Sequence, residues 1–266
     1  MPNPLPHIDW AQPWYDAVRP AFERAGSPED DFIDAFNVAA AQLDLRNHLG
    51  APLRFVPQDA LPEGMAYEAF ISATGNVPTR DNLHDFFNAL VWQSYPLIKR
   101  SLNALQAAQI AQDGIGKSRG PARDAATILD ENGALLVVRD SDAGRALVED
   151  LRAHRWLPAL YEKRAMFGRD LEVWLFGHAL MEKLVAPRKA ITAHTRVVFA
   201  NDDYFALAHD ARLAWLDRTV ADTLADEGLQ ATAVTPLQVL GVPGWWPGQD
   251  EDFYLDTTVF RPKRTA

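Results

Sequence analysis

Two histidines in this sequence each have polar side chains close behind them in the chain. His84 is followed by Asp85 and by Asn88, and His178 is followed by Glu182. Residues four apart in an α-helix lie on the same face, so each such pair can direct its donor atoms at one metal ion or one substrate atom. The two stretches that contain these histidines are therefore the first candidates for a functional site.

The residue types in the two stretches suit a divalent metal or proton transfer. Imidazole and carboxylate ligands without cysteine fit zinc, manganese or ferrous iron. In this hypothesis His84 and His178 bind the metal or carry protons, and Asp85 or Glu182 is a ligand or a general base. The sequence has no HExxH or HxH motif, so a histidine that donates to the glutamate of its own helix is the simpler alternative.

Five further residues complete the candidate site. Arg80 or Arg123 would hold an anionic group of a substrate. Asp124 stands beside Arg123 and is interpreted either as a catalytic acid or as the partner in a buried ion pair. Asn88 and Trp92 are four residues apart on the same helix and would contact the substrate.

Two other polar stretches are interpreted without a catalytic role. Asp130 and Glu131 stand directly before Asn132-Gly133, where acidic residues are common for turn formation alone. The segment AQDGIGKS (111–118) resembles the end of a phosphate-binding loop. It starts with alanine in place of glycine and follows a predicted helix, so residues 114–123 are interpreted as a flexible basic loop.

Several classes of chemistry are not expected. The chain has no cysteine, which removes disulfides, thiolate nucleophiles and iron–sulfur clusters. It has no GxSxG elbow and no GxGxxG after a strand, so a serine hydrolase of that type and a dinucleotide cofactor are not expected.

The first histidine is predicted to lie on a helix within residues 77–92, VPTRDNLHDFFNALVW. Thr79 is the expected N-cap. Pro78 disfavours the helical conformation at the residue before it, Val77, so the helix should begin only after Pro78. Apolar residues recur at the spacing of a face that packs on a core: Leu83, Phe86, Phe87, Leu90 and Val91. The polar residues then gather on the opposite side, facing a pocket or a second layer of structure.

The second histidine is predicted to lie on a helix over residues 175–185 that Pro187 stops. Phe176, Leu180 and Leu184 form its apolar side, which leaves His178 and Glu182 on one narrow polar stripe. If the helix is buried, both polar side chains must find partners, because an unpaired buried carboxylate is costly. A cluster with the first helix would supply them.

The remaining pattern predicts an α+β protein that is predominantly helical with a small antiparallel sheet. Two apolar runs around Asn132-Gly133 predict a β-hairpin over residues 126–138. Residues 191–200 are expected to form a strand, and residues 205–227 a long amphipathic helix. We expect one domain over residues 1–266, with N-terminal helices at 13–45 packed on the body and residues 235–266 as a wrap over it.

Composition narrows the possible partners. The formal net charge of −10 argues against nucleic acid and against anionic membrane surfaces, and it disfavours an RNA-associated function. The N-terminus lacks the features of a signal peptide, and no apolar run approaches the roughly 20 residues that a membrane span needs. The expected location is the cytoplasm, and the sequence carries no indication of oligomeric state.

Several of these stretches together resemble an uncharacterised bacterial family known as domain of unknown function 3025. The resemblance rests on VPTRDNLHDFFNALVW, RDAATILDENGALL, FGHALMEKL, VLGVPGWW and FYLDTTVFRP. It covers nearly the whole chain from about Phe55 onward and implies no activity.

The function that the residues favour is a small-molecule enzyme, such as a metal-assisted hydrolase, with a polar His/Asp/Glu pocket between two helices. The alternative is a non-catalytic binding or scaffold protein in which the same residues form a buried hydrogen-bond network. The distance between the two histidines distinguishes these hypotheses best.

Overall fold

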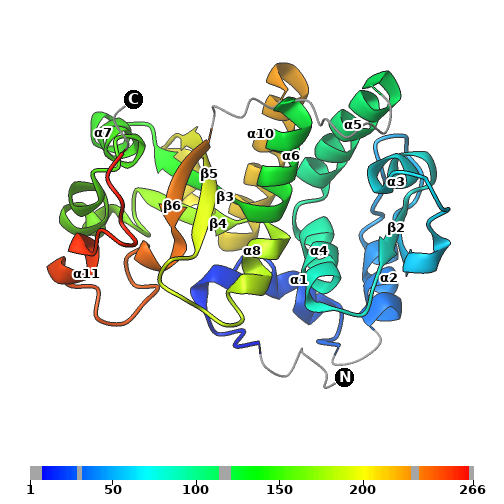
Figure 1. Cartoon of the computed structure of the whole chain (residues 1–266), viewed down its shortest axis with the longest axis horizontal. Coiled ribbons are helices and arrows are strands. Elements are labelled where there is room, and N and C mark those ends of the chain that lie inside the picture. Colours follow the sequence, from blue (N-terminus) through cyan, green and yellow to red (C-terminus); the bar gives the residue numbers. More distant parts are fainter. Residues whose placement is uncertain (1–7, 29–31, 114–120, 229–233, 264–266) are drawn as a thin grey trace.

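The computed structural model describes residues 8–28, 32–113, 121–228 and 234–263 (Figure 1). Its strands are β1 (Arg54–Pro57), β2 (Asn76–Thr79), β3 (Gly133–Arg139), β4 (Leu171–Leu175), β5 (Thr192–Ala200) and β6 (Val234–Gln238). Its α-helices are α1 (Arg19–Arg24), α2 (Phe32–Gln42), α3 (Tyr67–Thr74), α4 (Leu83–Ser94), α5 (Pro96–Asp113), α6 (Pro121–Asn132), α7 (Asp142–Arg152), α8 (His178–Lys183), α9 (Asp202–Ala206), α10 (His209–Glu227) and α11 (Glu251–Leu255). Shorter helical segments are η2 (Pro13–Tyr15), η3 (Gln58–Ala60), η4 (Leu157–Glu162), η5 (Arg164–Met166) and η7 (Val239–Gly241).

A four-stranded sheet with the order β4-β3-β5-β6 lies between two groups of helices (Figure 1). β3 is parallel to β5 and antiparallel to β4, and β5 is antiparallel to β6. The expected α+β class is confirmed. The sheet itself is mixed, whereas the sequence predicted a wholly antiparallel one, because the β3–β5 pairing joins segments about 60 residues apart and leaves no local signal.

β3 divides the core into two clusters. Its side chains alternate, so Leu135 and Val137 face the cluster that includes α4, α6 and α8, while Leu136 and Val138 face the cluster that includes α7 and the C-terminal segment. An uninterrupted apolar sequence is typical of a strand buried on both faces. The sequence correctly predicted a buried apolar strand here, but it assigned that strand to a β-hairpin, which the structure does not contain at this place.

The predicted hairpin over residues 126–138 is wrong. The chain forms helix α6 up to Asn132 and enters β3 directly at Gly133. Pro121 at the first position and buried Ala125, Ala126 and Leu129 are the features of an amphipathic helix. A Cβ at position 133 would lie 2.2 Å from the carbonyl oxygen of Leu129, so glycine is needed for this abrupt change from helix to strand.

The predicted helix at 175–185 is correct only in its second part. Residues 171–175 form β4, and α8 begins at His178. Phe176 and Gly177 connect them and donate backbone N–H groups to the Gly133 carbonyl, at 3.1 and 2.8 Å. Pairing with β3 therefore decides the conformation of residues whose own pattern fits a helix.

Helix α4 begins a few residues later than its predicted cap. Asn82 is the N-cap, and its side chain accepts a hydrogen bond from the Asp85 backbone N–H at 2.8 Å. Thr79 instead belongs to β2, where its hydroxyl donates to the Val77 carbonyl. The apolar face matches the prediction, since Phe86, Phe87, Leu90 and Val91 are fully buried.

The two ends of the chain pack against opposite parts of the molecule. Helices α1 and α2 contact α4, and β1 pairs in parallel with β2 as a separate two-stranded sheet. The expectation of an irregular C-terminal wrap is wrong for β6, which is a regular strand of the main sheet. Beyond β6, Val242, Tyr254 and Phe260 cover the second core cluster.

Within the described residues, no helix has the length and apolar character to cross a membrane.

The predicted strand at 191–200 is confirmed as β5, and the predicted helix at 205–227 corresponds to α10 preceded by the short α9. Residues 111–113 of the segment that resembles a phosphate-binding loop belong to α5, and its residues 114–118 lie outside the described residues. Of the predicted basic loop at 114–123, residues 114–120 also lie outside them, whereas residues 121–123 belong to α6, so the prediction of a loop there is wrong.

Candidate metal centre

Three helices bring a histidine, a glutamate and a second histidine together. His84 lies in the first turn of α4, Glu131 in the last turn of α6, and His178 is the first residue of α8. The three helices lie side by side next to the sheet (Figure 1). The ligand atoms of these three side chains all lie within 4.8 Å of one another.

Gly177 allows this approach. A Cβ at this position would lie 2.5 Å from the Gly133 nitrogen and 2.6 Å from the Glu131 carbonyl oxygen. The connection from β4 to α8 therefore runs directly against the backbone at the end of α6. This contact places His178 beside Glu131, because the two residues flank the point where the backbones touch.

The three separations fit one ion. Nε2 of His84 and Nε2 of His178 are 3.0 Å apart, and Oε2 of Glu131 is 3.6 Å from the His178 nitrogen and 4.0 Å from the His84 nitrogen. A point equidistant from three atoms so spaced lies about 2.1 Å from each, which is the usual length of zinc–nitrogen and zinc–oxygen bonds. Ideal tetrahedral coordination separates ligand atoms by about 3.4 Å, so small side-chain shifts complete it.

Carboxylates face the other nitrogen of both imidazole rings. Nδ1 of His84 lies 3.1 Å from Oε2 of Glu182, and Nδ1 of His178 faces Asp130, whose Oδ1 is 3.9 Å away. A carboxylate beside Nδ1 favours the tautomer with its proton on that nitrogen. Nε2 of His84 then directs a lone pair toward Nε2 of His178, as in a histidine ligand supported by an outer carboxylate. Nδ1 of His178 is buried without a hydrogen-bond partner among the described residues, and a small shift toward Asp130 would give it the same support.

A buried chain of polar contacts fixes Asp130. Lys99 donates to Asp130 at 2.6 Å and to the side-chain oxygen Oδ1 of Asn88 at 2.9 Å. Asn88 in turn donates to the Tyr67 hydroxyl at 3.0 Å, and the Lys99 ammonium group lies 5.2 Å from the ring centre of Trp92. The chain connects α3, α4 and α5 to α6 and holds Asp130 in place beside His178.

Burial sets the protonation of the site. Burial lowers the pKa of His178 to about 4, and the negative charge of Asp130 opposes that shift only in part. Burial raises the pKa of Glu131. Burial alone would also raise the pKa of Asp130, but the positive charge of Lys99, joined in acid by that of His178, outweighs it and holds this pKa below its ordinary value. His178 is therefore neutral at pH 7 and able to coordinate a metal.

The group has one open side. The side chains of His84 and Glu131 are 32% and 34% exposed, whereas that of His178 is 5% exposed. Glu182 is 39% exposed on the same side. An ion held by the three side chains could therefore be reached by water and by a small substrate from the side of His84 and the two glutamates.

A family model described as "Protein of unknown function (DUF3025)" matches residues 53–264. The chain belongs to the DUF3025 family. The match includes α4, α6 and α8, and it confirms the resemblance seen in the sequence. No curated protein and no solved structure matches this DUF3025 chain.

The DUF3025 fold brings together three of the residues that the sequence selected: His84, His178 and Glu182. It places Asp85 away from them. The Asp85 carboxylate accepts from the backbone N–H of Arg80 at 2.6 Å and from the guanidinium of Arg80 at 2.9 and 3.1 Å. These bonds tie Asp85 to the start of α4 and give it a structural partner.

Three other selected residues make no hydrogen bond to either histidine among the described residues. Asn88 and Trp92 are both buried, and both contact Lys99. Neither side chain therefore borders the open side of the group. Asp124 is exposed on α6, about two turns and roughly 10 Å along the helix axis from Glu131. Arg123 belongs to the first turn of the same helix, and its side chain lies outside the described residues.

Sequence reasoning missed Asp130 and Glu131. Both were assigned to a hairpin turn because Asn132-Gly133 is a strong turn signal. The alternative signal was the helical spacing of Ala125, Ala126 and Leu129, which places residue 130 beside the core and residue 131 at its border. Read as a helix, the segment would have offered its last turn as a third contributor to the site.

Proposed function

We propose that this DUF3025 protein binds one divalent transition metal through His84, His178 and Glu131 and uses it to hydrolyse a small molecule. The observation that carries the proposal is the 3.0 Å separation of two Nε2 atoms beside the Glu131 carboxylate, with Nδ1 of His84 paired to Glu182 and Nδ1 of His178 3.9 Å from Asp130. Two neutral imidazoles in these tautomers would direct lone pairs at each other. A cation between them, or an additional proton, removes that repulsion.

The ligand types favour zinc, with manganese and ferrous iron as alternatives. Two histidines and one glutamate leave a coordination position for water, and such an ion lowers the pKa of its bound water to about 7. Glu182 would keep His84 oriented, and its partial exposure places it at the border of the open side. Arg80 is 57% exposed near the start of α4 and remains the candidate for contact with an anionic substrate.

A second candidate function is a non-catalytic one. The chain from Tyr67 through Asn88 and Lys99 to Asp130 is buried and hydrogen-bonded, as expected for a structural network. This observation favours a scaffold role for that half of the cluster. It does not account for the open side at His84 and Glu131.

Metal titration tests the proposal. The purified chain is stripped with chelator and titrated with Zn²⁺ in a calorimeter, alongside His84→Ala, His178→Ala and Glu131→Gln. We expect one equivalent bound by the wild type and at least about a hundredfold weaker binding in each variant, because each loses one of three ligands. His209→Ala is the matched control, since His209 is exposed and its ring contacts Asp210 and Trp174, which are not part of the candidate centre.

The metal site would be disproved if the wild type bound no zinc, manganese or ferrous iron. It would also be disproved if the three variants bound the metal as tightly as the wild type does. If the metal binds and no hydrolysis of ester, amide or phosphoester probes follows, the site stands and the enzymatic part of the proposal fails.

A further inference from the structure

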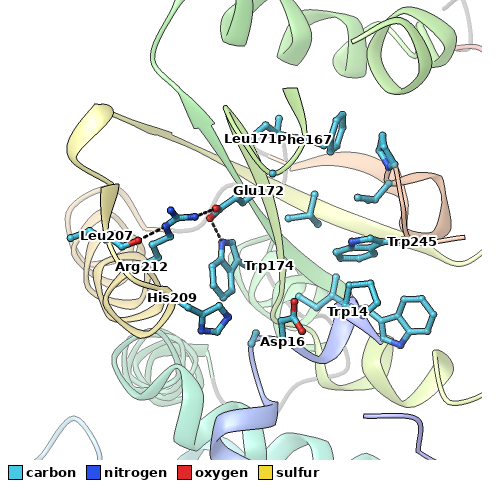
Figure 2. Close-up of a pocket in the computed structure, with 17 residues that line it drawn as sticks. Trp14, Asp16, Phe167, Leu171, Glu172, Trp174, Leu207, His209, Arg212 and Trp245 are labelled. Carbon is cyan, nitrogen blue, oxygen red and sulfur yellow. Dashed lines mark hydrogen bonds and ion pairs between the residues drawn. The ribbon is translucent and has the colours of Figure 1, made fainter. Parts of the chain in front are cut away.

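A hollow lies along strand β4, away from His84 and His178 (Figure 2). Its volume is about 440 Å³, within the range of ligand pockets. None of its lining residues belongs to the candidate metal centre. The inference drawn from this hollow is therefore independent of the proposed function.

The hollow follows the edge of the strand and not one face of it. All five residues of β4, Leu171 to Leu175, line it. Successive side chains of a strand point to opposite faces, so a cavity over one face would contact every second residue. A cavity that contacts all five lies beside the backbone.

That edge of the sheet has unused backbone groups. The sheet order makes β4 an edge strand. Arg139 N–H donates to the Asp170 carbonyl and Phe176 N–H to the Gly133 carbonyl. In the antiparallel register with β3, residues 170, 172, 174 and 176 therefore direct their backbone groups at β3, and residues 171, 173 and 175 direct theirs outward.

Two of the outward carbonyl groups have partners within the chain. Gly168 N–H donates to the Leu171 carbonyl, and the Tyr95 hydroxyl donates to the Leu175 carbonyl. Among the described residues, Val173 has no hydrogen-bond partner on this outer side. Its N–H and C=O groups are therefore free to pair with another strand.

The opposite edge of the sheet is protected. β6 carries Pro236, which has no N–H to offer, and Gln238 donates its side chain to the Val259 carbonyl of the C-terminal segment. Proline and covering segments are the usual protection of an edge strand. β4 has no proline, and residues 167–168 and Tyr95 cover its edge only at Leu171 and Leu175, so that the edge borders the hollow at Val173.

The two walls of the hollow differ in character. Glu172 and Trp174 lie on one side of β4 with Arg212 and His209, and Trp245 lies on the other side (Figure 2). Glu172 accepts hydrogen bonds from Arg212, the Tyr204 hydroxyl and Trp174, so the polar wall is held rigidly. Val173, Val242 and Trp245 pack at the apolar wall.

We propose that the edge of β4 binds an extended peptide that adds a strand to the sheet. Main-chain hydrogen bonds to Val173 provide affinity, and the two walls select a peptide in which apolar residues alternate with polar ones. The apolar residues face Trp245, and the others face Glu172 and Asp16 at the polar wall. Five residues of β4 span about 17 Å, which is enough for a peptide of five or six residues.

The test is a fluorescence anisotropy titration at about 0.15 M salt. The probe is a fluorescein-labelled six-residue peptide, capped at its C-terminus, in which valine alternates with lysine and threonine. A second peptide of the same sequence carries N-methyl groups at alternate residues, which removes the N–H donors that a strand requires. We expect saturable binding of the first peptide and at least about tenfold weaker binding of the second.

Val173→Pro removes the outward N–H without removing a bond to β3, and Val173→Thr keeps that N–H. We expect Val173→Pro to weaken binding at least about tenfold and Val173→Thr to retain it. The melting temperature and the zinc titration of each variant report whether the fold is intact. The N-methylated peptide tests the main-chain hydrogen bonds between peptide and β4 in the wild-type protein, without any substitution.

Three results would overturn the proposal. They are no binding of the first peptide, equal binding of the methylated peptide by the wild type, and a dimer in sedimentation that Val173→Pro dissociates. The last result would mean that a second copy of this chain occupies the edge.

Discussion

The separation of His84 and His178 determines what the side chains of the site can do. At 3.0 Å, two imidazole nitrogens must share a proton or a cation, and Glu182 already pairs with the opposite ring nitrogen of His84, while Asp130 lies 3.9 Å from that of His178. Spacing along the sequence identified both histidines and Glu182. It could not identify Glu131, because its contribution depends on a helix end that a strong turn signal concealed.

Lys99 supplies the positive charge of the buried polar network beside His178. Lys99 and Asp130 are both buried, and they form an ion pair. In Lys99→Met the carboxylate loses its positive partner, so we expect the free energy of unfolding to fall by about 3–5 kcal/mol. Chemical denaturation of the metal-free protein measures this loss.

The double variant Lys99→Met/Asp130→Asn removes the charge that Lys99→Met leaves unpaired. We expect it to recover a large part of the stability, because it also removes the buried carboxylate. Equal losses in the single and double variants would show that Lys99 acts through packing on Trp92 and not through its charge.

At the scale of elements, two tight backbone contacts position the site. Gly133 joins α6 to β3, and Gly177 joins β4 to α8 against the end of α6. Glycines are visible in a sequence, but the backbone that each one must approach is not. The apolar faces of α4 and β3 were predictable from their periodicity, whereas β4 was not, because its conformation comes from pairing with β3.

Gly177→Ala tests the contact between α8 and α6. Its Cβ would meet backbone atoms at 2.5–2.7 Å, which cannot move as flexible side chains do. We expect α8 to shift, with a loss of about 1–3 kcal/mol in the free energy of unfolding and at least about tenfold weaker zinc binding.

Gly168→Ala is the matched control for that substitution. Gly168 has a positive φ of 79° and open space around it, so alanine adds backbone strain of about 1–2 kcal/mol. We expect zinc binding to be unchanged there. Equal effects of the two alanines on zinc affinity would remove the positional role of Gly177.

The junction of α10 and α5 gives a prediction on pH. Asp217 of α10 is buried and accepts the backbone N–H groups of Leu97 and Ile98, at 3.0 and 2.9 Å, at the start of α5. Burial raises its pKa to about 6, although these two N–H groups oppose the shift. The folded pKa is above the unfolded value of about 3.9, so this stabilising contribution is complete below pH 4 and lost as the pH rises through 6.

Asp217→Asn removes that titration. Relative to the wild type, we expect the variant to gain on the order of 2–3 kcal/mol in the free energy of unfolding between pH 4 and pH 7. Urea denaturation of both proteins at several pH values measures the difference. A difference that does not change with pH would mean that the Asp217 carboxyl titrates normally.

At the scale of the whole molecule, the sheet joins two core clusters. Val173 and Trp245 pack against both clusters, and β3 contributes side chains to each. The predominantly helical α+β class followed from helical periodicity, while the parallel β3–β5 pairing could not be predicted because no local pattern sets it.

We therefore expect the described body to unfold as one unit, in agreement with the single domain expected from the sequence. Differential scanning calorimetry of the metal-free chain should give one transition with equal calorimetric and van't Hoff enthalpies. Two resolved transitions would assign the clusters to separate domains.

The most direct test of the metal centre is anomalous X-ray diffraction from crystals of the zinc-loaded protein. The account predicts one strong zinc peak about 2.0–2.2 Å from Nε2 of His84, Nε2 of His178 and a Glu131 carboxylate oxygen. Zinc found only elsewhere on the molecule, with the two imidazoles joined to each other by a hydrogen bond, would contradict it.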